Sequence, residues 1–494
     1  MRASGILLAL SSLPSPYGVG TLGRQAYEFI DFLRRAGQRF WQILPIGPTG
    51  YGDSPYQSFS AFAANPYLID LDLLIGEGLL RREEAVGAFF GDDPQRVDYG
   101  ALYANRLSVL RCAVARLGYE EPGFCAFRQE NGWWLDDYAL FMALKAAHGM
   151  VSFQEWPDRL RRREEDALIK ARREYGEDVR FWEAVQYLFY RQWEALKAYA
   201  NQNGVEIIGD IPIYVSPDSS DLWADPELFQ VGEDGRLREV AGCPPDAFSK
   251  DGQLWGNPLY DWDYHKGTGY HWWIRRLRHA SRVYDVVRID HFRGFESYYS
   301  IPAGEETAIP GHWRPGPGLD FIGALRRQLP GVRIIAEDLG YLTDEVRRLL
   351  LESGFPGMKV LQFAFDSRES GDYLPHGYRR NAVCYTGTHD NTTTVDWEHS
   401  APPADVAYAR EYLGVAPGGG LCAGFIRAAL SSVCDTCVIP MQDWLHLGGE
   451  ARMNTPSTLG GNWVWRMERE AMSGELADSI AHLTRLYGRE NKGN

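Results

Sequence analysis

The segment Tyr284–Arg293 (YDVVRIDHFR) shows how the rest of the chain is organised. It begins as a short run rich in β-branched residues and ends abruptly in charged residues of the kind found in active sites. Short apolar runs of this type are typical of strands buried on both faces of a parallel sheet. The sequence contains eight such runs: Gly5–Leu10, Phe40–Ile46, Val205–Ile213, Tyr284–Ile289, Val332–Ala336, Met358–Phe365, Ala382–Thr386 and Cys437–Met441.

Helical patterns separate several of these predicted strands. Ala26, Phe29, Ile30 and Leu33 follow the i, i+3, i+4, i+7 spacing of a helix face, and Gly37 is expected to end that helix. Eight strands alternating with helices predict an α/β fold, a (β/α)8 TIM barrel, whose usual length is about 250 residues. A doubly wound open sheet is the structural alternative.

The chain has 494 residues, so the barrel must carry insertions. The long intervals between predicted strands place large, mainly helical insertions after the second and third strands. The expected division is a catalytic barrel (1–64 and 186–494), an inserted helical subdomain (65–185) and an inserted loop region that lines the active site (216–265).

Composition and charge exclude several classes of protein. Hydrophobic residues make up 45% and charged residues 24%, which is typical of a globular domain. The formal charge of -15 argues against nucleic acid or an anionic membrane as partner. The basic run Arg159–Arg163 is followed at once by acidic residues, so we interpret it as a solvated helix face. Without a signal peptide pattern or a membrane-spanning apolar stretch, a cytoplasmic protein is expected.

Two motifs are interpreted as structural. The CxxC of Cys434 and Cys437 has no second ligand pair for zinc, so a buried thiol pair is expected. Gly18, Gly20 and Gly23 spell GxGxxG, but a proline-containing stretch separates them from the preceding strand. The dinucleotide fingerprint needs a tight strand-to-helix turn, so a dinucleotide-dependent oxidoreductase is only a distant alternative.

Four predicted strands end in a carboxylate: Asp210, Asp290, Glu337 and Asp390. In a (β/α)8 barrel these positions share one rim, where active sites lie. Any one of them alone is explained by capping a helix, but four in one ring favour a catalytic site.

Paired carboxylates are what retaining glycoside chemistry needs, because one attacks the sugar and the other moves the proton. Arg288 precedes Asp290 by two residues, so it points to the same strand face and favours the ionised nucleophile. Glu337, placed among other carboxylates, is expected to have a raised pKa and to act as the acid.

Three motifs carry a family resemblance. Val287–Gly294 (VRIDHFRG), Ile334–Gly340 (IIAEDLG) and Thr386–Asn391 (TGTHDN) closely resemble amylomaltases, the 4-α-glucanotransferases or disproportionating enzymes of glycoside hydrolase family 77 in the α-amylase clan. The resemblance covers essentially the whole chain. Further stretches similar to this family are Gly5–Gly23, Gly50–Asp70, Trp134–Lys145, Gln253–Tyr260 and Ala451–Arg466.

The resemblance implies three catalytic residues. Asp290 would be the nucleophile, Glu337 the acid/base, and Asp390 would hydrogen-bond the 2- and 3-hydroxyls of the sugar as its ring distorts. The substrate-binding residues implied by the resemblance are Tyr56, Asp210, Gln253, Trp255, Arg288, His389 and Asn462. Two positions depart from the family. Ala247 stands where a lid tyrosine is usual, and Ser457 replaces a frequent glycine.

The implied activity is a retaining transfer of α-1,4-glucan segments between maltooligosaccharides, amylose or related glucans, with glucose as an acceptor. No cofactor or metal is implied, and we expect a monomer or a homodimer. An α-1,4-glucan hydrolase would use the same carboxylates, and a non-catalytic glucan-binding protein would be expected to lack one of them.

Overall fold

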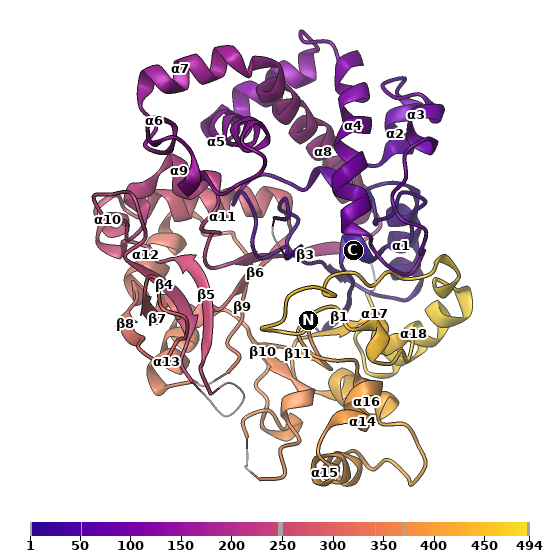
Figure 1. The fold of residues 1–494 in the computed structure, drawn as a ribbon. Coiled ribbons are helices and arrows are strands. Elements are labelled where there is room, and N and C mark those ends of the chain that lie inside the picture. The colour runs from indigo at the N-terminus through magenta and orange to yellow at the C-terminus, as the bar shows by residue number, and fades with distance from the viewer. Residues whose placement is uncertain (1, 51, 246–249, 341, 369–370, 492–494) are drawn as a thin grey trace.

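A barrel of eight parallel strands forms the centre of the molecule (Figure 1). The computed structural model describes residues 2–50, 52–245, 250–340, 342–368 and 371–491. The barrel strands are β1 (Ala3–Leu7), β2 (Phe40–Gln42), β3 (Glu206–Pro212), β6 (Val286–Asp290), β9 (Ile334–Ala336), β10 (Gly357–Val360), β11 (Ala382–Tyr385) and β12 (Thr436–Pro440).

The order of these strands is β10-β11-β12-β1-β2-β3-β6-β9, and every neighbouring pair is parallel. The backbone N–H of Ala336, in β9, donates to the carbonyl of Pro356, just before β10, at 2.9 Å and brings the two ends of the sheet together. Each of the eight strands overlaps one of the predicted runs. The (β/α)8 barrel is therefore confirmed, and the alternative of an open doubly wound sheet is wrong.

Helices cover the outside of the barrel as expected. In α1 (Arg24–Arg35) the predicted face of Ala26, Phe29, Ile30 and Leu33 is fully buried, and Gly37 follows the helix with a positive φ of 69°. Other helices that follow barrel strands or lead into them are α11 (His271–Val283), α12 (Gly318–Gln328), α13 (Asp344–Ser353), α14 (Thr394–Ser400), α15 (Pro403–Leu413), α16 (Leu421–Ser431), α17 (Met441–Trp444) and α18 (Gly474–Leu486).

The segment between β2 and β3 is helical and occupies the top of the view in Figure 1. It contains α2 (Leu71–Gly76), α3 (Arg82–Val86), α4 (Tyr99–Arg116), α5 (Pro122–Ala147), α6 (Asp158–Arg161), α7 (Glu165–Glu174) and α8 (Gly176–Gln202). The long helices α5 and α8 pack against each other. The domain division stays a prediction, and its boundary between residues 185 and 186 lies inside α8.

A second, antiparallel sheet stands beside the barrel, and the sequence analysis does not predict it. Its order is β5 (Gln253–Pro258), β4 (Glu239–Cys243), β7 (Ser297–Pro302) and β8 (His312–Pro315). It joins the segment after β3, which also holds α9 (Ser220–Ala224) and α10 (Trp262–Gly267), to the segment after β6. The pair that joins the two segments is β4 with β7. These strands are short and lie far apart in the chain, so local patterning gives no signal for their pairing.

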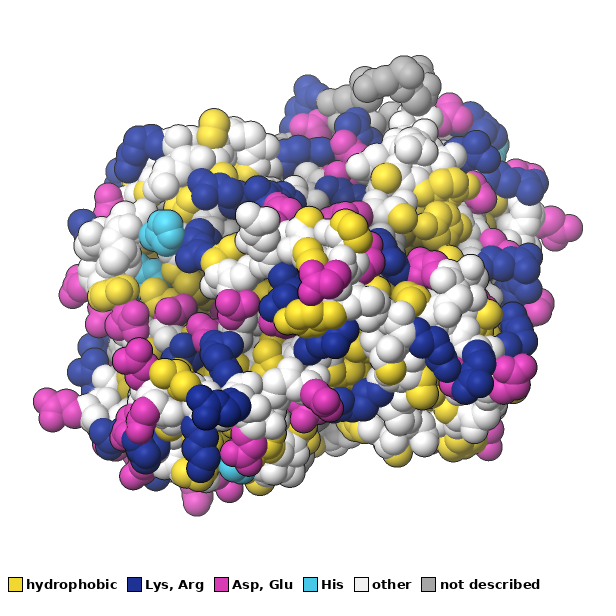
Figure 2. Space-filling model, turned by 90° about the horizontal axis from the view of Figure 1, so that it is seen from above, with side chains coloured by type: hydrophobic (Ala, Val, Ile, Leu, Met, Phe, Trp, Pro, Cys, Tyr) yellow, Lys and Arg dark blue, Asp and Glu magenta, His cyan; other side chains and the backbone are white. Residues whose placement is uncertain are grey.

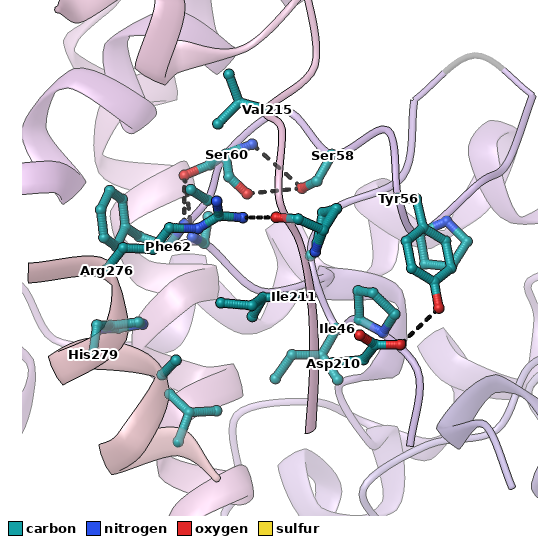
Figure 3. A pocket seen from close by; sticks show the side chains of 18 of the residues that line it. Ile46, Tyr56, Ser58, Ser60, Phe62, Asp210, Ile211, Val215, Arg276 and His279 are labelled. Carbon is teal, nitrogen blue, oxygen red and sulfur yellow. Dashed lines mark hydrogen bonds between the residues drawn. The ribbon is translucent and has the colours of Figure 1, made fainter. Parts of the chain in front are cut away.

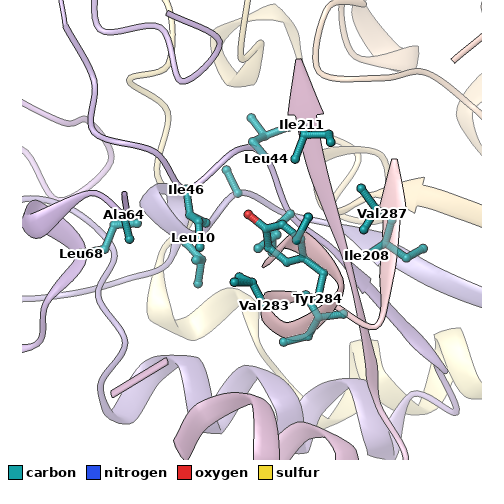
Figure 4. Packing of buried hydrophobic residues seen from close by; sticks show 14 of the residues in the cluster. Leu10, Leu44, Ile46, Ala64, Leu68, Ile208, Ile211, Val283, Tyr284 and Val287 are labelled. Atoms are coloured by element: carbon teal, nitrogen blue, oxygen red, sulfur yellow. The ribbon is translucent and has the colours of Figure 1, made fainter. Parts of the chain in front are cut away.

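Tight packing positions the end of β3. Tyr284 lies among Ile208, Ile211 and Val287 in the buried core (Figure 4). A Cβ on Gly209 would come within 2.1 Å of the Tyr284 ring. A glycine is therefore required directly before Asp210, because any side chain there would push the strand away from the core.

The cysteines, the surface charges and the helices can also be compared with the predictions from the sequence. Cys434 and Cys437 are both buried free thiols, as predicted. Acidic and basic side chains are interspersed on the face shown in Figure 2. In the described part of the chain, every helix is too short or too polar to cross a bilayer.

Candidate active site

An open cleft of about 540 Å³ lies at the C-terminal ends of the barrel strands. Seven of the ten predicted site residues line it: Tyr56, Gln253, Trp255, Asp290, His389, Asp390 and Asn462. The other three, Asp210, Arg288 and Glu337, are buried. The structure therefore separates seven residues that line the cleft from three that are buried.

Arg288 connects two carboxylates. It stands opposite Asp210 in the register of β6 and β3, and its Nη1 lies 2.6 Å from Asp210 Oδ2. The same nitrogen lies 3.0 Å from Oδ1 of Asp290, at the end of β6. The side chains of Asp210 and Arg288 are 0% and 3% exposed, while that of Asp290 is 29% exposed. Of the two carboxylates, only that of Asp290 is therefore exposed to the cleft.

Asp210 is buried and is not among the residues that line the cleft. Its Oδ2 also accepts a hydrogen bond from the Tyr56 hydroxyl at 2.8 Å (Figure 3). Among the described residues Oδ1 has no hydrogen-bond partner, and Asp210 lines a small cavity of about 60 Å³ behind the cleft. The Asp210 side chain is therefore fully buried against Arg288 and Tyr56, and its role in substrate binding stays a prediction.

Tyr56 and His389 form one wall of the cleft. Their rings stack with centroids 5.1 Å apart, and the Tyr56 oxygen lies 3.4 Å from His389 Nδ1. The other ring nitrogen of His389 lies 3.3 Å from Asp390 Oδ2. Burial lowers the pKa of His389, but the Asp390 carboxylate outweighs it, so the pKa is raised and the imidazole favours its proton.

Glu337 follows β9 and is held by backbone amides. One carboxylate oxygen accepts from the His291 N–H at 2.6 Å and the other from the Leu339 N–H at 2.7 Å. His291, directly after Asp290, has a left-handed φ of 54°, a conformation that is costly for a residue other than glycine. The turn that follows Asp290 is therefore also the turn that binds Glu337.

The environment raises the pKa of both Asp290 and Glu337. Burial is the largest cause in each case, and the two carboxylates also interact with each other. Arg288 opposes the shift at Asp290, for which it is the largest charge partner. At Glu337 the largest charge effect is the repulsion from Asp290. The arrangement favours an ionised Asp290 and a protonated Glu337, as the sequence analysis expects for nucleophile and acid.

Asp390 is held by a residue that the sequence analysis does not single out. Asn454 Nδ2 donates to Asp390 Oδ1 at 2.7 Å, and Arg452 donates to the Asp390 carbonyl at 2.9 Å. Burial would raise the pKa of Asp390, but His389 and Asn454 lower it to about 2. Both supporting residues lie in the stretch Ala451–Arg466, whose resemblance to the family was the available signal.

The remaining predicted residues, Gln253, Trp255 and Asn462, also line the cleft. Trp255 meets the His291 ring edge-on at 4.8 Å and donates from Nε1 to Gln253 Oε1 at 3.0 Å. Asn462 ties its loop together by accepting from the Thr455 N–H at 2.9 Å. Ala247 lies outside the described residues.

Ser457 has a left-handed φ of 63°. Glycine adopts this conformation without the steric penalty of a Cβ, which gives a physical reason for the glycine that the family frequently has there.

Comparisons with known proteins agree with this architecture. The family profile of 4-alpha-glucanotransferases matches residues 8–472. A 4-alpha-glucanotransferase of Clostridium butyricum is 47% identical over 483 residues, 97% of this chain and 99% of the relative. One from Thermus thermophilus is 49% identical over 493 residues, 96% of each chain. The amylomaltase structure from Streptococcus agalactiae in complex with acarbose superposes with a TM-score of 0.97 at 43% identity, covering 99% of this chain and 100% of that one.

The barrel and its carboxylate-lined rim define an enzyme of the class that acts on glycosidic bonds through paired carboxylates. The chain belongs to the 4-alpha-glucanotransferase family, glycoside hydrolase family 77. The resemblance inferred from its motifs is confirmed.

Proposed function

We propose that this enzyme transfers α-1,4-glucan segments from a donor maltooligosaccharide to the 4-hydroxyl of an acceptor glucan or glucose. The observation that carries the proposal is the ion pair of 3.0 Å between Arg288 and Asp290 at the floor of the cleft, next to a second carboxyl whose pKa burial raises. A cation that favours one ionised carboxylate beside a protonated one fits a retaining double displacement.

In the first half-reaction, Asp290 attacks C1 of the donor sugar while Glu337 gives its proton to the glycosidic oxygen. The shorter glucan leaves, and the rest of the donor stays bound to Asp290 as a β-linked ester. To reach that oxygen, Glu337 would have to release the hydrogen bonds that it accepts from the amides of His291 and Leu339. Asp390, oriented by Asn454 and His389, accepts hydrogen bonds from the sugar hydroxyls.

In the second half-reaction, Glu337 removes the proton from the acceptor 4-hydroxyl, and that oxygen attacks C1. The ester bond to Asp290 breaks, so one glycosidic bond is exchanged for another with retained configuration. The walls formed by Tyr56, Trp255 and Asn462 would hold the glucan chain. A cytoplasmic location and a monomer or homodimer remain part of this proposal.

Incubation of the purified protein with maltotriose alone tests the reaction. Transfer produces glucose together with a ladder of longer oligomers. Glucose and maltose without longer products would show that water intercepts the intermediate and that the hydrolase alternative holds.

The residue roles need separate variants. Asp290→Asn and Glu337→Gln should each abolish turnover while the far-UV circular dichroism spectrum stays unchanged. Near-normal activity in either variant would refute the assigned role of that residue. The exposed Glu305→Gln serves as a control, since Glu305 lies away from the cleft-lining residues.

A further inference from the structure

A second large cavity lies outside the active site. It has a volume of about 530 Å³, close to that of the catalytic cleft and within the roughly 300–1,000 Å³ typical of small-ligand sites. Its walls come from the end of α6, from α9 and the turn after it, and from α10. None of the residues that line the catalytic cleft lines this cavity.

The basic run of the sequence forms one wall of this cavity. The structure differs here from the expected solvated helix face, because α6 ends at Arg161 and the chain then turns through Arg163, whose φ is 56°. Arg161, Arg162 and Arg163 all line the cavity, and Arg238 lines it as well. Four guanidinium groups therefore gather at one site in a chain whose formal charge is -15.

These guanidinium groups are not all neutralised by the protein. Arg161 is held by Asp158 at 2.9 Å and by the Asp234 carbonyl at 2.8 Å. Among the described residues, the side chains of Arg162 and Arg238 form neither a hydrogen bond nor an ion pair.

Arg163 is partly satisfied and rigidly placed. Its Nη2 lies 2.8 Å from Asp137, and the guanidinium lies over the Trp223 ring at 4.2 Å. Its buried Nη1 has no hydrogen-bond partner among the described residues. Because that nitrogen has almost no solvent-accessible surface, Arg163 borders the cavity without offering it a donor. The guanidinium groups of Arg162 and Arg238 are exposed and suited to bind an oxyanion, which accepts hydrogen bonds in the planar geometry that arginine offers.

The rest of the lining favours a ligand that also carries hydroxyl groups. Glu227, Glu233 and Asp261 face the same cavity and would repel a simple anion, but carboxylates accept hydrogen bonds from hydroxyls. The Tyr264 side chain is 40% exposed and offers an aromatic face beside them. The arginines suit a phosphate group, and the acidic and aromatic residues suit a sugar. A single ligand that carries both groups would match this lining.

We propose that this cavity binds a phosphomonoester of a hexose, with its phosphate on Arg162 and Arg238 and its hydroxyls toward Glu227 and Asp261. The ligand is a second small molecule, bound apart from the glucan in the catalytic cleft. No bond is made or broken there.

Isothermal titration calorimetry tests the proposal with three probes: glucose 1-phosphate, glucose 6-phosphate and inorganic phosphate. Saturable binding of a hexose phosphate is expected, and the double variant Arg162→Gln/Arg238→Gln should weaken it at least about tenfold, since two charge-assisted contacts are lost. The same variant should keep the unliganded disproportionation rate. The matched control is Arg159→Gln, in the same basic run but paired with Glu164 and Asp166 outside the cavity.

Several outcomes would overturn the proposal. They are no saturable binding of a hexose phosphate, or binding that survives in the double variant. Loss of binding when maltotriose saturates the protein would place the ligand in the catalytic cleft instead. Equal affinity for inorganic phosphate would refute the sugar part of the site and leave only an oxyanion site.

Discussion

Asp210 and Arg288 face each other in register on neighbouring barrel strands, and their 2.6 Å ion pair is almost completely buried. Arg288 is thereby fixed where the same nitrogen reaches Asp290. A buried ion pair is expensive to desolvate, so its value here is geometric: it holds a cation beside the proposed nucleophile.

Replacing Arg288 with glutamine should destabilise the protein and shift its pH profile. Asp210 would be left as a buried charge without a cation, which costs about 3–5 kcal/mol of unfolding free energy. Arg288 lowers the pKa of Asp290, so its loss should raise that pKa and move the acid limb of kcat/KM to higher pH. Urea unfolding and rates on maltotriose across pH measure the two effects.

The double variant Asp210→Asn/Arg288→Gln is the control for this experiment. It removes the orphaned charge, so it should recover part of the lost stability but not the activity. An acid limb that stays in place in Arg288→Gln would contradict the role given to the arginine.

Glu337→Gln should stabilise the protein at neutral and alkaline pH. The pKa of Glu337 is raised in the fold, so the folded state binds the proton more tightly than the unfolded chain does. The stability from this group is fully present below the unfolded value of about 4.3 and is lost as pH rises through the folded pKa. The melting temperature of the variant relative to the native protein should therefore increase from pH 4 to pH 9.

The control variant is Glu305→Gln, at an exposed position. Its melting temperature relative to the native protein should change much less with pH. If the melting temperatures of Glu337→Gln and the native protein differ by the same amount at every pH, the native carboxyl is not desolvated.

Asn454→Ala should reduce kcat because Asp390 loses the hydrogen bond that orients it. A hydrogen bond to a charged group is worth about 1.5–3 kcal/mol, so a fall of about 10- to 100-fold is expected. Asn454 also lowers the pKa of Asp390, so the pKa should rise in the variant. Steady-state kinetics on maltotriose separate this effect from binding.

Asn462→Ala lies in the same loop but contacts Thr455 and Thr458 instead of Asp390, so its main effect should be on KM. If Asn454→Ala keeps the native kcat, Asn454 does not position Asp390 for the reaction.

Ser457→Gly should not destabilise the protein and should raise the free energy of unfolding by up to about 1 kcal/mol. A left-handed conformation costs an ordinary residue about 1–2 kcal/mol, and glycine avoids this cost at some expense in chain entropy. The control is Ser108→Gly, at an exposed position within α4, which should lose stability. Equal losses in both variants would show that the strain at Ser457 is negligible.

The barrel was readable from the sequence because its signals are local. Each of the eight strands is a short apolar run such as Val205–Ile213, and the face of α1 repeats with the helical period. The carboxylates at the strand ends were also readable, because a parallel barrel brings those ends to one rim.

Supporting contacts were not readable in the same way. The sequence places Asp210 at the end of a strand, and only the strand register shows that it is buried against Arg288. Asn454 reaches Asp390 across 64 residues of chain, and β4 pairs with β7 across a similar gap. Such partners have no common local pattern, so their pairing cannot be derived from spacing.

The sequence by itself therefore determined the fold, the family and which carboxylates stand at the rim, because apolar periodicity and strand-end position are properties of short segments. The tertiary structure decided which of those groups line the cleft, which are buried, and that the arginines at and after the end of α6 form one wall of a cavity. These outcomes depend on distances between segments far apart in the chain, and on the burial and charge that only packing creates.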